Sequence, residues 1–140
     1  MKRLALALAL GPTVLLAACG GTACTSSPAT PQNTSNPSCS VAAGQLVTVN
    51  VALCGKCTDS APSCQAEFVN GQLEVQPVVQ QCQEQAGCPI AASCDITPPV
   101  ATCTVTIPAG TNSPVTLVVV GNATYTGTVN ITGTNTTCNL

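Results

Sequence analysis

The sequence predicts a small, mainly β domain that is held together by disulfide bonds. The chain has 140 residues with eleven cysteines, no histidine, one phenylalanine, one tyrosine and no tryptophan. Valine and threonine dominate its patterned segments, and both favour a pleated backbone over a helix. A core of small aliphatic side chains buries little area per residue, so we expect cross-links to supply part of the stability.

Residues 39–140 are predicted to form this β domain. Hydrophobic and polar residues alternate over 47–53, 101–107 and 125–131, with the period of two that is typical of half-buried strands. About six short strands with Pro- and Gly-rich turns indicate a compact antiparallel β-sandwich or Greek-key barrel. The best helical candidate, residues 78–85, follows a proline directly and is long enough for a turn or two at most.

A first hairpin is predicted at Asn70-Gly71, because both central positions of a type I′ turn need a positive φ. A two-residue loop at this point pairs Phe68 with Leu73 on one face of the hairpin. It also places Glu67 opposite Glu74 on the other face.

A second hairpin is predicted at Gly121-Asn122. A two-residue loop would set Val119 against Thr124, and a three-residue loop would set it against Tyr125. The longer loop keeps one face of the hairpin apolar, so we expect that register.

Residues 1–18 have the layout of a secretory signal peptide. Lys2 and Arg3 precede an apolar run that extends from residue 4 to residue 18. A membrane-spanning helix would need about 20 apolar residues, and this run is shorter and is interrupted by Gly11-Pro12. We therefore expect the segment to be removed on export.

The end of this segment, Leu16-Ala17-Ala18-Cys19, resembles the lipobox of bacterial lipoproteins. The resemblance implies cleavage before Cys19, a diacylglyceryl group on its thiol, and acylation of its freed amine. Two or three acyl chains hold a protein firmly on a bilayer, at about 0.8 kcal/mol per buried CH₂. Gly20 in place of Asp favours the outer membrane of a two-membrane bacterium, by what is known of the family. The alternative is an ordinary signal peptide with Cys19 in a disulfide.

Residues 19–38 are predicted to be the lipidated cysteine and a flexible tether. The stretch after Cys19 is rich in Gly, Ser, Thr, Pro and Asn, and it lacks the periodicity needed to bury apolar surface. Such a coil would hold the domain roughly 25 Å from the lipid. Cys24 is the exception, because an even cysteine count predicts that it pairs with the domain.

Ten cysteines remain when Cys19 is set aside, which predicts five disulfides. Spacing leaves their connectivity open. We expect only that Cys138 fastens the C-terminal strand and that the segment between Cys82 and Cys103 is a loop region held by bridges. The ten candidates are Cys24, Cys39, Cys54, Cys57, Cys64, Cys82, Cys88, Cys94, Cys103 and Cys138.

The motif Cys54-Gly55-Lys56-Cys57 resembles the active-site dithiol of thioredoxin-like oxidoreductases, and its lysine would favour a thiolate. That fold needs a long helix from the second cysteine, and Pro62 interrupts any helix here. The tryptophan that usually precedes the family's motif is also missing. We therefore expect a structural disulfide, with an envelope thiol-disulfide oxidoreductase that uses Cys54 and Cys57 as the alternative.

Metal binding and other kinds of catalysis have fewer suitable residues in this sequence. A zinc site on Cys54, Cys57 and Cys64 lacks the second C-x-x-C of a zinc ribbon, and histidine-based catalysis lacks its base. The pair Glu67 and Glu74 could do acid/base work or bind calcium, although a solvated outer face is the more common role of such a pair. We therefore predict no cofactor, no metal site and a non-enzymatic structural or binding function.

Charge limits the partners of the chain. Removal of Lys2 and Arg3 with the signal changes the side-chain balance from −2 to −4 and leaves Lys56 as the only basic side chain. Nucleic acid and electrostatic binding to anionic lipid are therefore excluded. The expected partners are the lipid bilayer, through acylated Cys19, and an unidentified protein or polymer of the envelope.

Overall fold

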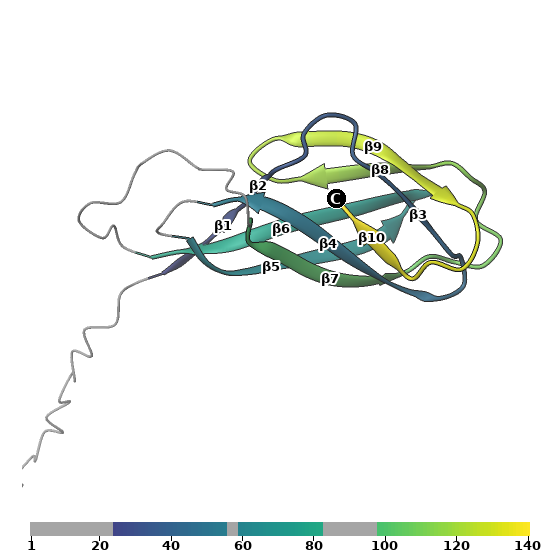
Figure 1. Ribbon diagram of the computed structural model, residues 1–140, viewed down its shortest axis with the longest axis horizontal. Helices are drawn as coiled ribbons and strands as arrows, with labels where there is room; N and C mark the ends of the chain where they lie inside the picture. Colours follow the sequence, from purple (N-terminus) through teal and green to yellow (C-terminus); the bar gives the residue numbers. More distant parts are fainter. Residues whose placement is uncertain (1–23, 56–58, 83–97) are drawn as a thin grey trace, which may run out of the picture.

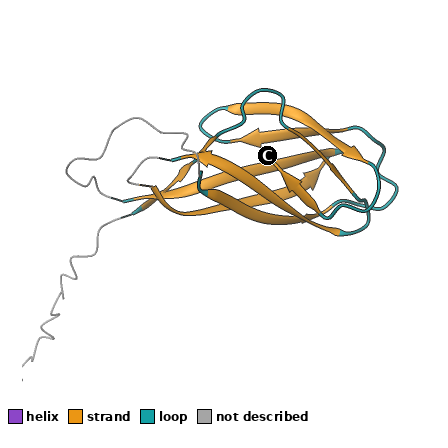
Figure 2. Ribbon diagram, in the orientation of Figure 1, coloured by secondary structure: helices purple, strands orange, loops and turns teal. Residues whose placement is uncertain are grey.

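The computed structural model describes residues 24–55, 59–82 and 98–140. Within these ranges the chain forms ten strands and no helix, as Figures 1 and 2 show. The strands form two sheets that share one hydrophobic core. The mainly β, disulfide-rich fold predicted from the sequence is therefore confirmed. The signal peptide and the residues Cys19, Lys56, Cys57, Cys88 and Cys94 lie outside the described ranges.

The first sheet is organised around β6. One edge of β6 pairs antiparallel with β5, and its other edge pairs antiparallel with β1 and parallel with β8. The sheet continues through β9, antiparallel to β8, and ends with β3, parallel to β9. Its six strands are β1 (Thr25–Pro28), β3 (Ser38–Val41), β5 (Asp59–Val69), β6 (Gln72–Gln81), β8 (Val115–Val120) and β9 (Thr124–Ile131).

The second sheet is organised around β4 (Leu46–Cys54). One edge of β4 pairs antiparallel with β7 (Val100–Thr106). The other edge pairs with β2 (Thr30–Pro31), which is antiparallel, and with β10 (Thr137–Asn139), which is parallel.

The core is aliphatic, as the composition predicts. Phe68 and Tyr125 are only half-buried at its margin, and none of the buried side chains in the described ranges is polar or charged. The alternation along each strand explains which side chains are buried, because every second residue of a strand faces the same side. The fully buried side chains of the central strands are Val47, Val49, Val51 and Leu53 of β4 and Leu73 and Val75 of β6.

Both predicted hairpins are confirmed in type and register. Asn70 and Gly71 have φ values of 51° and 76°, and Phe68 pairs with Leu73 across the turn. The three-residue loop after β8 sets Val119 against Tyr125. The three strands predicted over 47–53, 101–107 and 125–131 correspond to β4, β7 and β9.

Gly127 of β9 is required by a close backbone approach. A Cβ at this position would overlap the carbonyl oxygen of Pro37, which accepts a hydrogen bond from the amide of Thr128 at 3.0 Å. The strand pattern therefore contains glycine here because a neighbouring segment crosses it, which is a common reason for glycine within a strand.

The predicted flexible tether is wrong from Cys24 onward. Residues 25–28 pair with the end of β6 as β1, and the amide of Ala29 donates to the carbonyl of Pro77 at 2.9 Å. Ala29 is buried, and so is Pro37, which is among the fully buried side chains. The composition of this segment did not predict that it is structured, because it has no hydrophobic stripe. Backbone hydrogen bonds and a disulfide hold it against the domain instead.

Two further expectations differ from the structure. Three pairings, β3 with β9, β8 with β6 and β10 with β4, are parallel although an antiparallel sandwich was expected. Alternation marks a strand but does not specify the direction of its partner. The helical candidate at 78–85 is extended up to Gln81, because Val75, Pro77 and Val79 continue the buried alternation of β6.

Leu73→Ala should lower the free energy of unfolding by roughly 2–5 kcal/mol, because the side chain is fully buried and its removal leaves a cavity. The control is Leu46→Ala, since Leu46 is 60% exposed and its truncation should change stability by no more than about 0.5 kcal/mol. Urea unfolding with the disulfides intact measures both. Equal effects of the two substitutions would contradict the assigned core.

Candidate functional site

All seven cysteines in the described ranges are disulfide-bonded. Three bridges have both partners described: Cys24–Cys82, Cys39–Cys138 and Cys64–Cys103. The expectation that Cys24 folds back onto the domain and the expectation that Cys138 fastens the C-terminal strand are both confirmed.

Two of these bridges close the margins of the sandwich. Cys64 of β5, one edge of the first sheet, is bonded to Cys103 of β7, which lies beside it in the second sheet. At the opposite margin Cys39 of β3 is bonded to Cys138 of β10. Edge strands of open sheets expose unpaired backbone groups that invite association with other chains. Here the edges are held against each other in covalent pairs.

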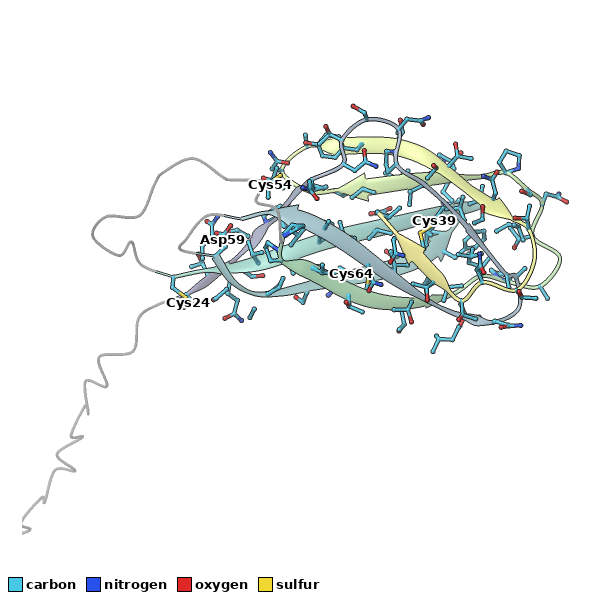
Figure 3. All side chains as sticks on the ribbon, viewed as in Figure 1. Cys24, Cys39, Cys54, Asp59 and Cys64 are labelled. Carbon is cyan, nitrogen blue, oxygen red and sulfur yellow. A yellow bond between two sulfur atoms is a disulfide. The ribbon has the colours of Figure 1, made fainter. Side chains whose placement is uncertain are left out.

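The third bridge lies at one end of the sandwich, which we name the Cys24 end. Figure 3 shows Cys24, Cys54 and Asp59 at this end, whereas Cys39 and Cys64 lie farther along the domain. Asp59 and Thr25 both pair with Gln81 at the end of β6. A hollow of about 340 Å³ opens here, and its lining includes Thr30, Cys54, Asp59 and Asn122.

The C-x-x-C motif begins at this end but presents no accessible thiol in the described ranges. Cys54 ends β4, is only 6% exposed and is disulfide-bonded. Lys56 and Cys57 lie outside the described residues. The zinc site considered for this motif is ruled out in its proposed form, because Cys64 is bonded to Cys103 and offers no thiolate.

Glu67 and Glu74 are cross-strand neighbours, as the hairpin register predicts. Glu67 is exposed, and half-buried Glu74 accepts a hydrogen bond from Nε2 of Gln76 at 2.6 Å. With Gln65 and Ala66, these side chains line a hollow of about 190 Å³ on the outer face of β5 and β6. In the described part of the chain, no group of three or more His, Cys, Asp or Glu side chains is placed to hold a metal ion.

The central part of the outer face of the second sheet is a polar, uncharged surface. Neighbouring residues are joined by hydrogen bonds: Nδ2 of Asn50 donates to Oδ1 of Asn139 at 3.0 Å, and Oγ1 of Thr102 donates to Oδ1 of Asn50 at 3.0 Å. Strand register places two rows side by side on β7, β4 and β10. The rows are Thr102, Asn50 and Asn139, and Thr104, Thr48 and Thr137.

This Thr/Asn face is a surface for hydrogen bonding. The threonine alternation in β7 is visible in the sequence, but the alignment with β10 depends on a parallel pairing between residues about ninety positions apart. Hydroxyl and amide groups can donate and accept, so the face suits a neutral polar partner. It supplies no group with the acidity or nucleophilicity that catalysis needs.

Comparison with protein-family models, with characterised proteins and with solved structures gives no match for this chain. The described residues contain no helix that is long and apolar enough to cross a membrane. The function is therefore inferred from the residues of this chain alone.

Removal of either margin disulfide should destabilise the domain. We expect Cys64→Ala/Cys103→Ala and Cys39→Ala/Cys138→Ala each to lower the free energy of unfolding by about 2–5 kcal/mol, because the unfolded chain regains freedom. Denaturant unfolding without reductant measures the change. The matched control is Ser40→Ala in β3, which neighbours a bridge without taking part in it. Double variants as stable as this control would show that the bridges contribute nothing to the fold.

Proposed function

We propose that the chain is a lipid-anchored lipoprotein of a bacterial cell envelope whose β domain has a structural or binding role. The observation that carries this proposal is the lipobox-like sequence from Leu16 to Cys19, which is followed within a few residues by a disulfide-stapled domain. Disulfides form and persist in oxidising compartments outside the cytosol. Their presence therefore supports export, and Gly20 favours the outer membrane.

Cysteine parity supports the same proposal. Ten cysteines follow Cys19, an even number, and the seven that lie in the described ranges are all disulfide-bonded. Six of these seven form three bridges with one another, and a full set of five bridges among the ten would leave Cys19 for another use. Thioether attachment of lipid gives that odd sulfur a role.

A binding or structural role fits the surfaces of the domain. The Thr/Asn face and the hollow beside Glu67 and Glu74 offer hydrogen bonds to a partner, and the described ranges contain no lysine or arginine. The chain has no histidine to act as a base for a serine or cysteine nucleophile. The partner we propose is a neutral, polar component of the envelope, either a protein or a polymer.

Intact mass measurement tests the anchor. The mature protein should begin at Cys19 with an added diacylglyceryl and acyl mass, and full reduction should add ten hydrogens, two for each of five bridges among ten cysteines. Cys19→Ser should lose the lipid mass and move from the detergent phase to the aqueous phase in detergent partitioning. Retention of Met1, or aqueous partitioning of the unsubstituted protein, would overturn the proposal.

Alkylation distinguishes this role from thiol oxidoreductase activity. Because Cys54 is bridged and nearly buried, iodoacetamide should leave it unmodified both in the native protein and after mild treatment with glutathione. Peptide mass mapping reads out each site. Selective alkylation of Cys54 and Cys57, before any other cysteine reacts, would favour the oxidoreductase instead.

A further inference from the structure

The Cys24–Cys82 disulfide fixes the end of the domain close to the site of lipid attachment. Cys24 is five residues after Cys19 in the sequence. At about 3.6 Å per residue, a fully extended chain of that length spans no more than roughly 18 Å. The bridge transfers this limit to Cys82, which follows β6 directly.

The opposite end of the sandwich is a full strand length away. We name it the hairpin end, because it carries the Asn70-Gly71 turn that begins β6. β4 runs in the same direction, from exposed Leu46 to Cys54, which shares the hollow at the Cys24 end with Gln81. Nine residues of strand from Leu46 to Cys54 cover about 26 Å. This length exceeds the longest reach of the tether, so Cys19 can lie beside the Cys24 end but cannot reach the hairpin end.

Charge does not compete with this covalent constraint. The described ranges contain Asp59, Glu67 and Glu74 and no basic side chain, so no described surface attracts anionic lipid. Leu46, Val69 and Val100 are the exposed large hydrophobic residues of the described ranges, and they do not form a continuous insertion surface on one strand. The position of lipid attachment is then the dominant constraint on orientation.

We infer that the Cys24–Cys82 disulfide orients the domain on the bilayer, with the Cys24 end facing the lipid headgroups and the hairpin end facing away. This inference rests on the proposed lipidation of Cys19. It assigns the hollow around Cys54 and Asp59 to the bilayer side of the domain. It leaves the Asn70-Gly71 turn and the part of the Thr/Asn face nearest Thr104 accessible to a partner in the surrounding compartment.

Energy transfer from single tryptophans tests the orientation, because the chain has no tryptophan of its own. Gln80→Trp reports on the Cys24 end and Leu46→Trp reports on the hairpin end, and both positions are exposed. The lipidated protein is reconstituted in phosphatidylcholine vesicles that contain a dansyl-headgroup lipid. Transfer should be several-fold stronger from position 80 than from position 46, and it should not change with ionic strength.

The role of the disulfide is tested by Cys24→Ala/Cys82→Ala in the Gln80→Trp background. Without the bridge, the four-residue strand β1 is held to the end of β6 by backbone pairing alone, and we expect it to detach. The next fixed point is then Ala29, whose amide donates to the carbonyl of Pro77. The tether then doubles to about ten residues and reaches roughly 36 Å. Transfer from position 80 should fall clearly, while circular dichroism verifies that the β fold remains.

Flotation with the vesicles is measured first, so that two failures can be told apart. Protein that fails to float with the vesicles would overturn the proposed anchor, and the orientation with it. Floating protein with equal transfer from positions 80 and 46 would overturn the orientation alone. Unchanged energy transfer in the double cysteine variant would show that the Cys24–Cys82 bridge does not set the orientation.

Discussion

Two narrow sheets pack around a core that has almost no aromatic side chains, and the stability of the whole domain follows from this packing. Val47, Val49 and Val51 face Leu73 and Val75 across that core, and each is fully buried. Small aliphatic groups contribute less burial energy per residue than aromatic ones. Stability therefore has to be added outside the core, and the described disulfides lie at the two margins and at one end of the sandwich.

The bridges connect this constraint to the surfaces of the domain. Cys64–Cys103 and Cys39–Cys138 hold the edges of the two sheets together, so the outer faces are the surfaces left for a partner. β10 contributes Asn139 to the Thr/Asn face because the second of these bridges, with its parallel pairing, fixes it beside β4. The disulfides that add stability to the weak aliphatic core thus also position the Thr/Asn face that we propose for binding.

Local patterns predicted the parts of the fold that depend on neighbouring residues. The alternation in β4 and the Asn70-Gly71 turn specify strands and register because side-chain direction and turn φ are local properties. The register in turn predicted the Glu67 and Glu74 pair. The ordering of residues 25–38, the parallel strands and the disulfide connectivity were not predictable, because they depend on contacts between distant segments with polar or unpatterned sequences. The Thr/Asn face depends on one of those contacts, so the threonine alternation alone did not show which strands lie side by side in it.

Complete reduction of the mature domain in buffer without denaturant tests whether the fold depends on its disulfides. If the aliphatic core is insufficient by itself, the reduced domain should lose its β-sheet circular dichroism and the dispersion of its amide NMR signals, and reoxidation should restore both. A reduced domain that keeps a folded spectrum would contradict this dependence, because the core would then suffice without the bridges.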